Sequence, residues 1–110
     1  MATVEITHVA FQTFSMLSRY MLEFIGANKT LALAEKLVGV VDEKLSEAPL
    51  HGPVCHELES LGVTDYRQLT VDKYKVIYRY DELTQTVYVM AFLRHKQSVQ
   101  QLLIAHSLLL

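Results

Sequence analysis

The sequence predicts an α+β fold in which a two-helix hairpin packs on one face of a small antiparallel sheet. Three observations support this: a short alternating stretch near the start, two long stretches with apolar residues at helical spacing, and three β-rich stretches joined by short polar connectors. The element order is β-α-α-β-β-β, with room for a C-terminal helix. Since 110 residues suffice for one core but not for two ordinary domains, residues 1–110 are expected to form a single domain.

The overall composition limits the class of protein. Hydrophobic residues make up 51% of the chain and charged residues 20%, as in a packed globular protein. A net charge of −2 lacks the basic field of a protein that holds nucleic acid mainly through phosphate contacts. The single cysteine, Cys55, suits a reducing compartment, and neither a secretion leader nor an apolar run of about 18 residues occurs. A cytoplasmic protein without membrane contact is expected.

The N-terminal half predicts one strand and two helices. Residues 3–9 alternate β-branched and polar side chains, which indicates a strand that joins the sheet edge. Residues 11–25 and 30–47 each carry apolar side chains three or four positions apart, and Gly26 is expected to end the first helix, with Asn28 or Thr30 capping the second. Because neither amphipathic helix is stable alone in water, both are expected to lie on the sheet.

The C-terminal half predicts an antiparallel meander. Residues 49–65 form a loop with a short helical turn at 56–61, and strands follow at 66–70, 73–80 and 86–93, the last of them central. The remaining residues form a final helix or an apolar arm. Its apolar side chains are expected to dock either on the protein's own sheet or on a partner: Leu102, Leu103, Ile104, Leu108, Leu109 and Leu110.

The pairing of the last two strands decides which side chains share a face. If Tyr80 pairs with Thr86, one face carries eight side chains of both strands, and a shift of one residue would change that set. The eight are Tyr74, Val76, Tyr78, Tyr80, Tyr88, Met90, Phe92 and Arg94.

Cationic residues gather on these strands. Lys75 and Arg79 share a face about 13 Å apart, at a rise of about 3.3 Å per residue. Arg67 on the preceding strand can join them in a cationic strip, or all three are solvated surface charges. Arg94-His95-Lys96 at the end of the last strand is either a solvated terminus or an anion site, and His95 can donate a proton near neutral pH.

No metal or cofactor is expected. Cys55-His56-Glu57 has neither a second cysteine nor a spaced histidine pair, so loop packing accounts better for Cys55 than a zinc site does. The sequence also lacks a glycine-rich phosphate loop and the common hydrolase and metalloprotease motifs.

The segments LSEAPLHG, YRQL, YKVIYRY and VYVMAFLRHKQ, within residues 45–103, resemble the RelE/ParE superfamily of type II toxin–antitoxin toxins, and more closely its ParE branch. The resemblance implies one of two activities. ParE-type toxins inhibit DNA gyrase and block replication, whereas RelE-type toxins are ribosome-dependent endoribonucleases that cleave mRNA. It therefore implies a cognate antitoxin and DNA gyrase as partners, or alternatively the ribosome and mRNA, with operator DNA bound only through the antitoxin complex.

The two activities assign different roles to the cationic residues. RNA cleavage needs a base, cations that stabilise the phosphate, and an acid. By resemblance the candidates are Arg67, Lys75, Arg79 and His95, but the aromatic residue common near the C-terminus of RelE-like nucleases is missing, and only the distant His106 could replace it.

In a gyrase inhibitor the cationic residues would instead contact the target or the antitoxin. That set is Arg67, Lys75, Arg79, Arg94, His95 and Lys96. The mild acidity and the missing nuclease residues favour gyrase inhibition. A further alternative is an inactive family member that only binds an antitoxin-like partner.

Overall fold

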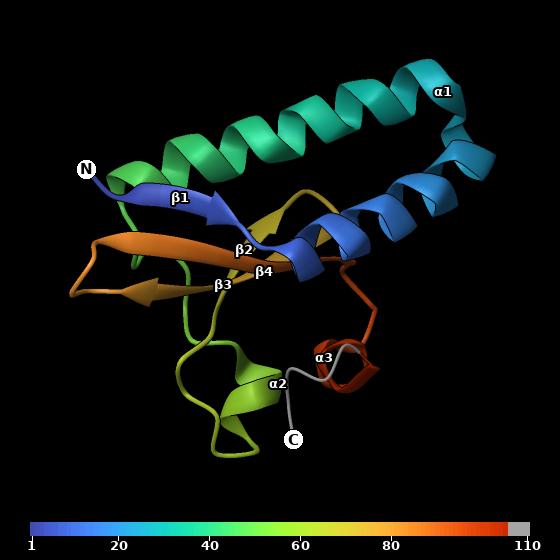
Figure 1. Cartoon of the computed structure of the whole chain (residues 1–110). Coiled ribbons are helices and arrows are strands. Elements are labelled where there is room, and N and C mark those ends of the chain that lie inside the picture. Colours follow the sequence, from blue (N-terminus) through green and yellow to red (C-terminus); the bar gives the residue numbers. More distant parts are fainter. Residues whose placement is uncertain (106–110) are drawn as a thin grey trace.

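The computed structural model describes residues 1–105, apart from the side chain of Leu103, and confirms the α+β fold. A four-stranded sheet has α1 (His8–Glu47) on one face, and α2 (His56–Glu59) and α3 (Val99–Ala105) pack against the other (Figure 1). The strands are β1 (Thr3–Ile6), β2 (Arg67–Val71), β3 (Tyr74–Asp81) and β4 (Thr86–Arg94).

The sheet is mixed rather than wholly antiparallel. Its order is β1-β4-β3-β2, with antiparallel pairs except at β1, which runs parallel to β4. Parallel neighbours need a long crossover, and all of the chain between Ile6 and Thr86 separates these two strands. The predictions that the first strand lies at the edge and the last strand is central are confirmed.

Gly26 divides α1 into the two arms of the expected hairpin (Figure 1). Its φ of +81° and ψ of 170° lie in a region of backbone conformation where residues other than glycine are strained. The turn is tighter than expected, because Asn28 and Thr30 lie inside the helix instead of capping it. The first arm also begins earlier than expected, at His8. Thr7 is its N-cap, because the hydroxyl of Thr7 accepts a hydrogen bond from the amide of Ala10.

Alanine substitutions at two glycines of α1 are expected to have opposite effects on stability. Gly26→Ala forces a side chain into the strained turn and should cost about 1–3 kcal/mol. Gly39→Ala, inside the second arm with no atom near the added methyl group, should stabilise by about 0.5–1 kcal/mol because alanine favours helix. Urea unfolding of both variants measures the two signs, and a neutral Gly26→Ala would contradict the hairpin turn.

The main core lies between α1 and the sheet. Both arms contribute to it, and the hydroxyl of Thr13 fastens the first arm to β4 by accepting a hydrogen bond of 3.0 Å from the amide of Phe92. Phe14 meets the ring of Phe92 edge-on at 4.9 Å. The fully or nearly fully buried members include Ala10, Leu17, Leu37, Val41, Leu45, Val76, Tyr78, Val87 and Val89.

A second cluster on the other face holds the described part of the C-terminal segment. Val99 and Leu102 of α3 pack with Cys55 and Leu58 against Ile77, Ala91 and Leu93 of the sheet. The described part therefore docks on the protein's own sheet, although Ile104 stays exposed. The packing role of Cys55 is confirmed. His106, Leu108, Leu109 and Leu110 lie outside the described residues.

The hairpin register differs from the expected one. Asp81, not Tyr80, pairs with Thr86, and a bulge at Met90 changes the pairing from Tyr78–Val89 to Ile77–Ala91. The core face under α1 therefore carries Val87 and Val89 in place of Tyr88 and Met90. Beyond the bulge the expected alternation returns, because the extra residue offsets the shift of one position. Phe92 and Arg94 consequently share a face with Val76 and Tyr74, as expected, but they pair with these residues instead of Met90 and Phe92, the partners that the expected register implies.

Candidate functional site

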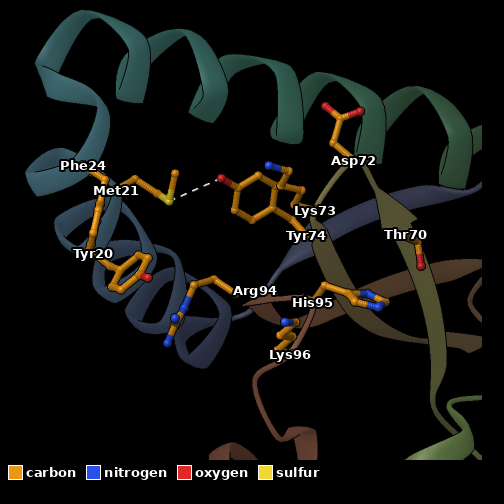
Figure 2. Close-up of a pocket in the computed structure, with 10 residues that line it drawn as sticks. All are labelled: Tyr20, Met21, Phe24, Thr70, Asp72, Lys73, Tyr74, Arg94, His95 and Lys96. Carbon is orange, nitrogen blue, oxygen red and sulfur yellow. Dashed lines mark hydrogen bonds between the residues drawn. The ribbon is translucent and has the colours of Figure 1, made fainter.

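A pocket of about 520 Å³ opens at the end of the sheet, beside the first arm of α1 (Figure 2). The turn between β2 and β3, the start of β3 and the end of β4 form one side, and α1 forms the other. Its lining residues are Tyr20, Met21, Phe24, Thr70, Asp72, Lys73, Tyr74, Arg94, His95 and Lys96. The cationic cluster singled out in the sequence therefore lies in a concave site and not on a flat surface.

The α1 side of the pocket is aromatic. The rings of Tyr20 and Phe24 lie 4.7 Å apart, and Phe24 remains 66% exposed. The hydroxyl of the buried Tyr74 lies 3.3 Å from the sulfur of Met21, as the dashed line in Figure 2 marks. Burial, together with the nearby Asp72 and Tyr20, raises the pKa of Tyr74 above its ordinary value. Tyr74 therefore stays protonated near neutral pH.

The sheet side of the pocket is positively charged. The guanidinium of Arg94 lies 3.9 Å from the ring centroid of Tyr20, which fixes it by a cation–π contact. The amide of His95 donates to the carbonyl of Lys73 at 2.8 Å, so the ends of the strands hold each other. Among the described residues that line the pocket Asp72 is the one acid, and it forms a salt bridge with Lys36. Among the described residues, the acid of the lining is therefore already paired, and it does not neutralise Lys73, Arg94 or Lys96.

Arg94 and His95 point in opposite directions, although they are consecutive. Figure 2 shows the Arg94 side chain directed toward Tyr20, and the His95 ring directed toward Thr70 of β2. Alternation at the end of β4 accounts for the difference. The two side chains are therefore not arranged to act on one reacting atom.

Arg67 lies away from the pocket and has a structural partner. Its guanidinium donates to the carbonyl of Gly52 at 2.7 Å, and the amide of Gly52 donates to the hydroxyl of Tyr78 at 2.9 Å. Burial raises the pKa of Tyr78, although the Gly52 amide and Arg67 act in the opposite direction. These contacts hold the loop before α2 against the sheet.

The cationic strip, one of the two alternatives for these residues, does not form. Arg67 pairs with Tyr78 and shares its face, whereas Lys75 pairs with Thr70 on the opposite face. Arg79 shares the face of Lys75 and stacks on Tyr88, with its guanidinium 4.6 Å from the ring centroid. Side-chain alternation along the strands places Arg67 on the opposite face from the other two. A correct strand order alone does not reveal this, because the face of each side chain depends on the register.

Lys75 is only 7% exposed and lies close enough to Glu57 to act on its charge. The Glu57 carboxylate accepts hydrogen bonds from the hydroxyl of Ser98 at 2.7 Å and from the amides of Val99 and Gln100 at 2.9 and 3.3 Å. Burial alone would raise the pKa of Glu57, but these bonds and the charge of Lys75 together lower it. Glu57 is thus a cap that fastens the start of α3.

Two parts of this arrangement have little signal in the sequence. Tyr20 and Phe24, four residues apart on α1, share one side of the helix outside its regular apolar stripe, and such an aromatic pair is the signal that could have found them. The contact between Glu57 and Ser98 joins residues 41 positions apart, and no local pattern indicates it.

Within residues 1–105, no group of three or more His, Cys, Asp or Glu side chains is placed to hold a metal ion. In the same part of the chain, no helix is both long enough and apolar enough to cross a membrane.

Solved structures similar to this one include proteins of toxin–antitoxin systems. A chain from the chromosomal ParDE TA system of P. aeruginosa is 17% identical, with a TM-score of 0.69 over 86% of this chain and 96% of that one. In the RelBE2 toxin–antitoxin complex from Mycobacterium tuberculosis the matching chain is 20% identical, with a TM-score of 0.61 over 86% and 93%. The isolated E. coli RelE toxin is 14% identical, with a TM-score of 0.52 over 99% and 100%. At these identities the likeness establishes the RelE/ParE-like fold.

The sequence itself decides the family. The model of the ParE toxin of the type II toxin–antitoxin system parDE matches residues 4–99, and the chain belongs to this family. The sequence comparison with curated proteins gives no match. The resemblance to the RelE/ParE superfamily is thereby confirmed, and the protein is a toxin of a type II toxin–antitoxin module.

Proposed function

We propose that the protein inhibits DNA gyrase, and so arrests growth, unless a cognate antitoxin neutralises it. Membership of the ParE toxin family supports gyrase as the target. The observation that carries the choice against RNA cleavage is the separation of the candidate catalytic residues. Arg67 is bonded to the Gly52 carbonyl and Lys75 lies on the opposite sheet face, so neither accompanies His95 in the pocket.

A ribonuclease would need these groups to converge. Transfer of the 2′-hydroxyl proton, stabilisation of the phosphate and protonation of the leaving oxygen all occur at one small site, where correct placement supplies much of the rate. Here Arg94 and His95 diverge (Figure 2), and Tyr74, whose pKa is raised above its ordinary value of 10.0, stays protonated near neutral pH. This arrangement suits binding better than chemistry.

Of the six cationic residues expected to contact a partner, we assign that role to Arg94, His95 and Lys96, which line the pocket. Arg67, Lys75 and Arg79 have structural surroundings of their own within the chain. The protein would act in the cytoplasm, where gyrase and its DNA are found. It would reach operator DNA only through the complex with its antitoxin.

A supercoiling assay with purified gyrase tests the proposal. The toxin is expected to abolish supercoiling and to accumulate cleavage complexes, and preincubation with the antitoxin encoded in the neighbouring reading frame should restore activity. Unchanged supercoiling at high toxin excess would refute the proposal. Codon-phased cuts in translated mRNA that disappear in His95→Ala would instead identify an endoribonuclease, and induced expression without growth arrest would identify an inactive antitoxin-binding protein.

A further inference from the structure

We propose that the pocket and a neighbouring cavity form one groove for a segment of the antitoxin with an apolar–acidic–apolar pattern, whose acidic side chain pairs with Arg94. The inference rests on the proposed function in one respect: the occupant belongs to the cognate antitoxin. It goes further by assigning the site on this chain and the chemistry of the segment that fills it.

The groove follows from two cavities that share a wall. The second cavity, of about 200 Å³, lies along the first arm of α1 toward α3. Tyr20 and Arg94 line both cavities, so their cation–π pair stands between them. The lining of the second cavity is Thr13, Met16, Leu17, Tyr20, Phe92, Arg94, Gln97 and Leu102. A bound chain would therefore pass Arg94 midway and place side chains on either side of it.

The charges of the groove select an acidic occupant. Lys73, Arg94 and Lys96 lie around the first cavity of a protein whose net charge is −2, so positive charge is concentrated there. Within residues 1–105 the salt bridge between Lys36 and Asp72 is the only one, and it neutralises the acid of the lining. Arg94 is held against an aromatic ring, which favours a directed, charge-assisted hydrogen bond to a carboxylate.

The apolar surface of the groove selects large apolar side chains next to the acid. Phe24, Tyr20 and Met16 are 66%, 39% and 47% exposed on the first arm. Adjacent exposed aromatic and sulfur-containing side chains of this kind mark binding surfaces more often than single exposed residues do. Residues two apart in an extended peptide are spaced by about 7 Å and point to the same side. In a helix, residues three or four apart share a side. In either conformation, apolar side chains before and after the acid can therefore reach the two cavities.

The same surface suits a peptide better than single-stranded nucleic acid. Nucleic acid would need cations along the whole path of its phosphates. Within residues 1–105, Arg94 is the only basic residue in the lining of the second cavity, and the other walls of this cavity include Met16, Leu17, Phe92 and Leu102. One cation between two apolar depressions matches one acidic side chain between two apolar ones.

Dissociation constants of the full-length antitoxin, measured by competition against a labelled copy, test the proposal. Arg94→Glu is expected to weaken binding about 100-fold or more, and Arg94→Ala about 30-fold, as for a central arginine of an interface. Arg79→Glu is the matched control, since Arg79 also stacks on a tyrosine but on the opposite face of the sheet, and it should change affinity less than about 3-fold. Circular dichroism checks that each variant is folded.

A charge exchange gives the decisive result. Each acidic residue of the antitoxin is replaced by lysine in turn, and one replacement, flanked by apolar residues, should restore at least about tenfold of the affinity lost in Arg94→Glu. Unaltered antitoxin affinity of Arg94→Glu, or the absence of any rescuing replacement, would overturn the proposal. The proposal would also be overturned if Arg94→Glu lost affinity for a 12-nucleotide single-stranded RNA but still bound the antitoxin normally. That result would make the groove a nucleic-acid site.

These measurements are independent of the gyrase assay. A wild-type toxin that leaves supercoiling unchanged would refute gyrase inhibition, while the antitoxin affinities would still decide the groove. Conversely, Arg94→Glu that still binds the antitoxin at wild-type affinity would refute the groove and leave gyrase inhibition untouched.

Discussion

Replacing Gly52 by alanine is expected to lower the free energy of unfolding by about 3–5 kcal/mol. A Cβ atom at this position would lie 2.3 Å from the carbonyl oxygen and 2.9 Å from the carbonyl carbon of Gln68, and these are backbone atoms that cannot rotate away. The loop would have to move, and its bonds to Arg67 and Tyr78 would stretch or break. For a domain of this size the melting temperature should fall by about 10 °C or more.

Replacing a second glycine, Gly62, serves as a control that distinguishes the steric clash at Gly52 from the general effects of replacing a glycine. Gly62 has a φ of +83° but no atom within 4 Å of its would-be Cβ, so Gly62→Ala should cost only about 1–2 kcal/mol of backbone strain. Thermal unfolding followed by circular dichroism compares the two variants. Similar losses in both would contradict the close packing of Gly52 against β2.

Removing the Glu57 carboxylate is expected to detach α3. Glu57→Ala loses the three hydrogen bonds to Ser98, Val99 and Gln100, and should lower the free energy of unfolding by about 2 kcal/mol. Amide hydrogen exchange should become faster in α3 and near Leu58, whose cluster α3 covers. Glu59→Ala, an exposed position on the same short helix, is the control and should leave these rates unchanged.

The same contact predicts a dependence on pH. Because the pKa of Glu57 is lower in the folded protein than its ordinary value of 4.5, its stabilising contribution is complete above about pH 4.5 and is lost as the pH falls through the lower folded-state pKa. Wild type should therefore lose more stability between pH 6 and pH 3 than Glu57→Gln, which has no carboxylate to titrate. Equal losses would mean that the ionised carboxylate does not hold α3.

Local patterns in the sequence were sufficient for the elements but not for their register. The arms of α1 follow from apolar spacing, and β3 and β4 from their β-branched and aromatic residues. The bulge at Met90 and the pairing of Asp81 with Thr86 have no such pattern. Register depends on how both faces of the hairpin pack, and a shift of one residue changes every side chain's face.

The same division applies to the candidate site. The Arg94-His95-Lys96 cluster stands out in the sequence because three cationic or titratable residues follow a strand. The aromatic wall opposite it comes from α1, 70 or more positions earlier, and only packing of the first arm on β4 joins the two. Arg67 and Lys75 do not form a strip for a related reason. The register between neighbouring strands decides which face of the sheet each side chain occupies, and here it places these two on opposite faces.

The sequence by itself determined the family, the order of elements and the cationic end of β4, because these depend on residue type and spacing along the chain. Only the tertiary structure decided which charges have partners and which line a pocket. Arg67 and Lys75 became parts of the framework, whereas Arg94 came to rest on Tyr20 at the opening of a groove. Charge and hydrogen bonding act over a few ångströms in space, and distances of that kind are set by packing between elements that are remote in the sequence.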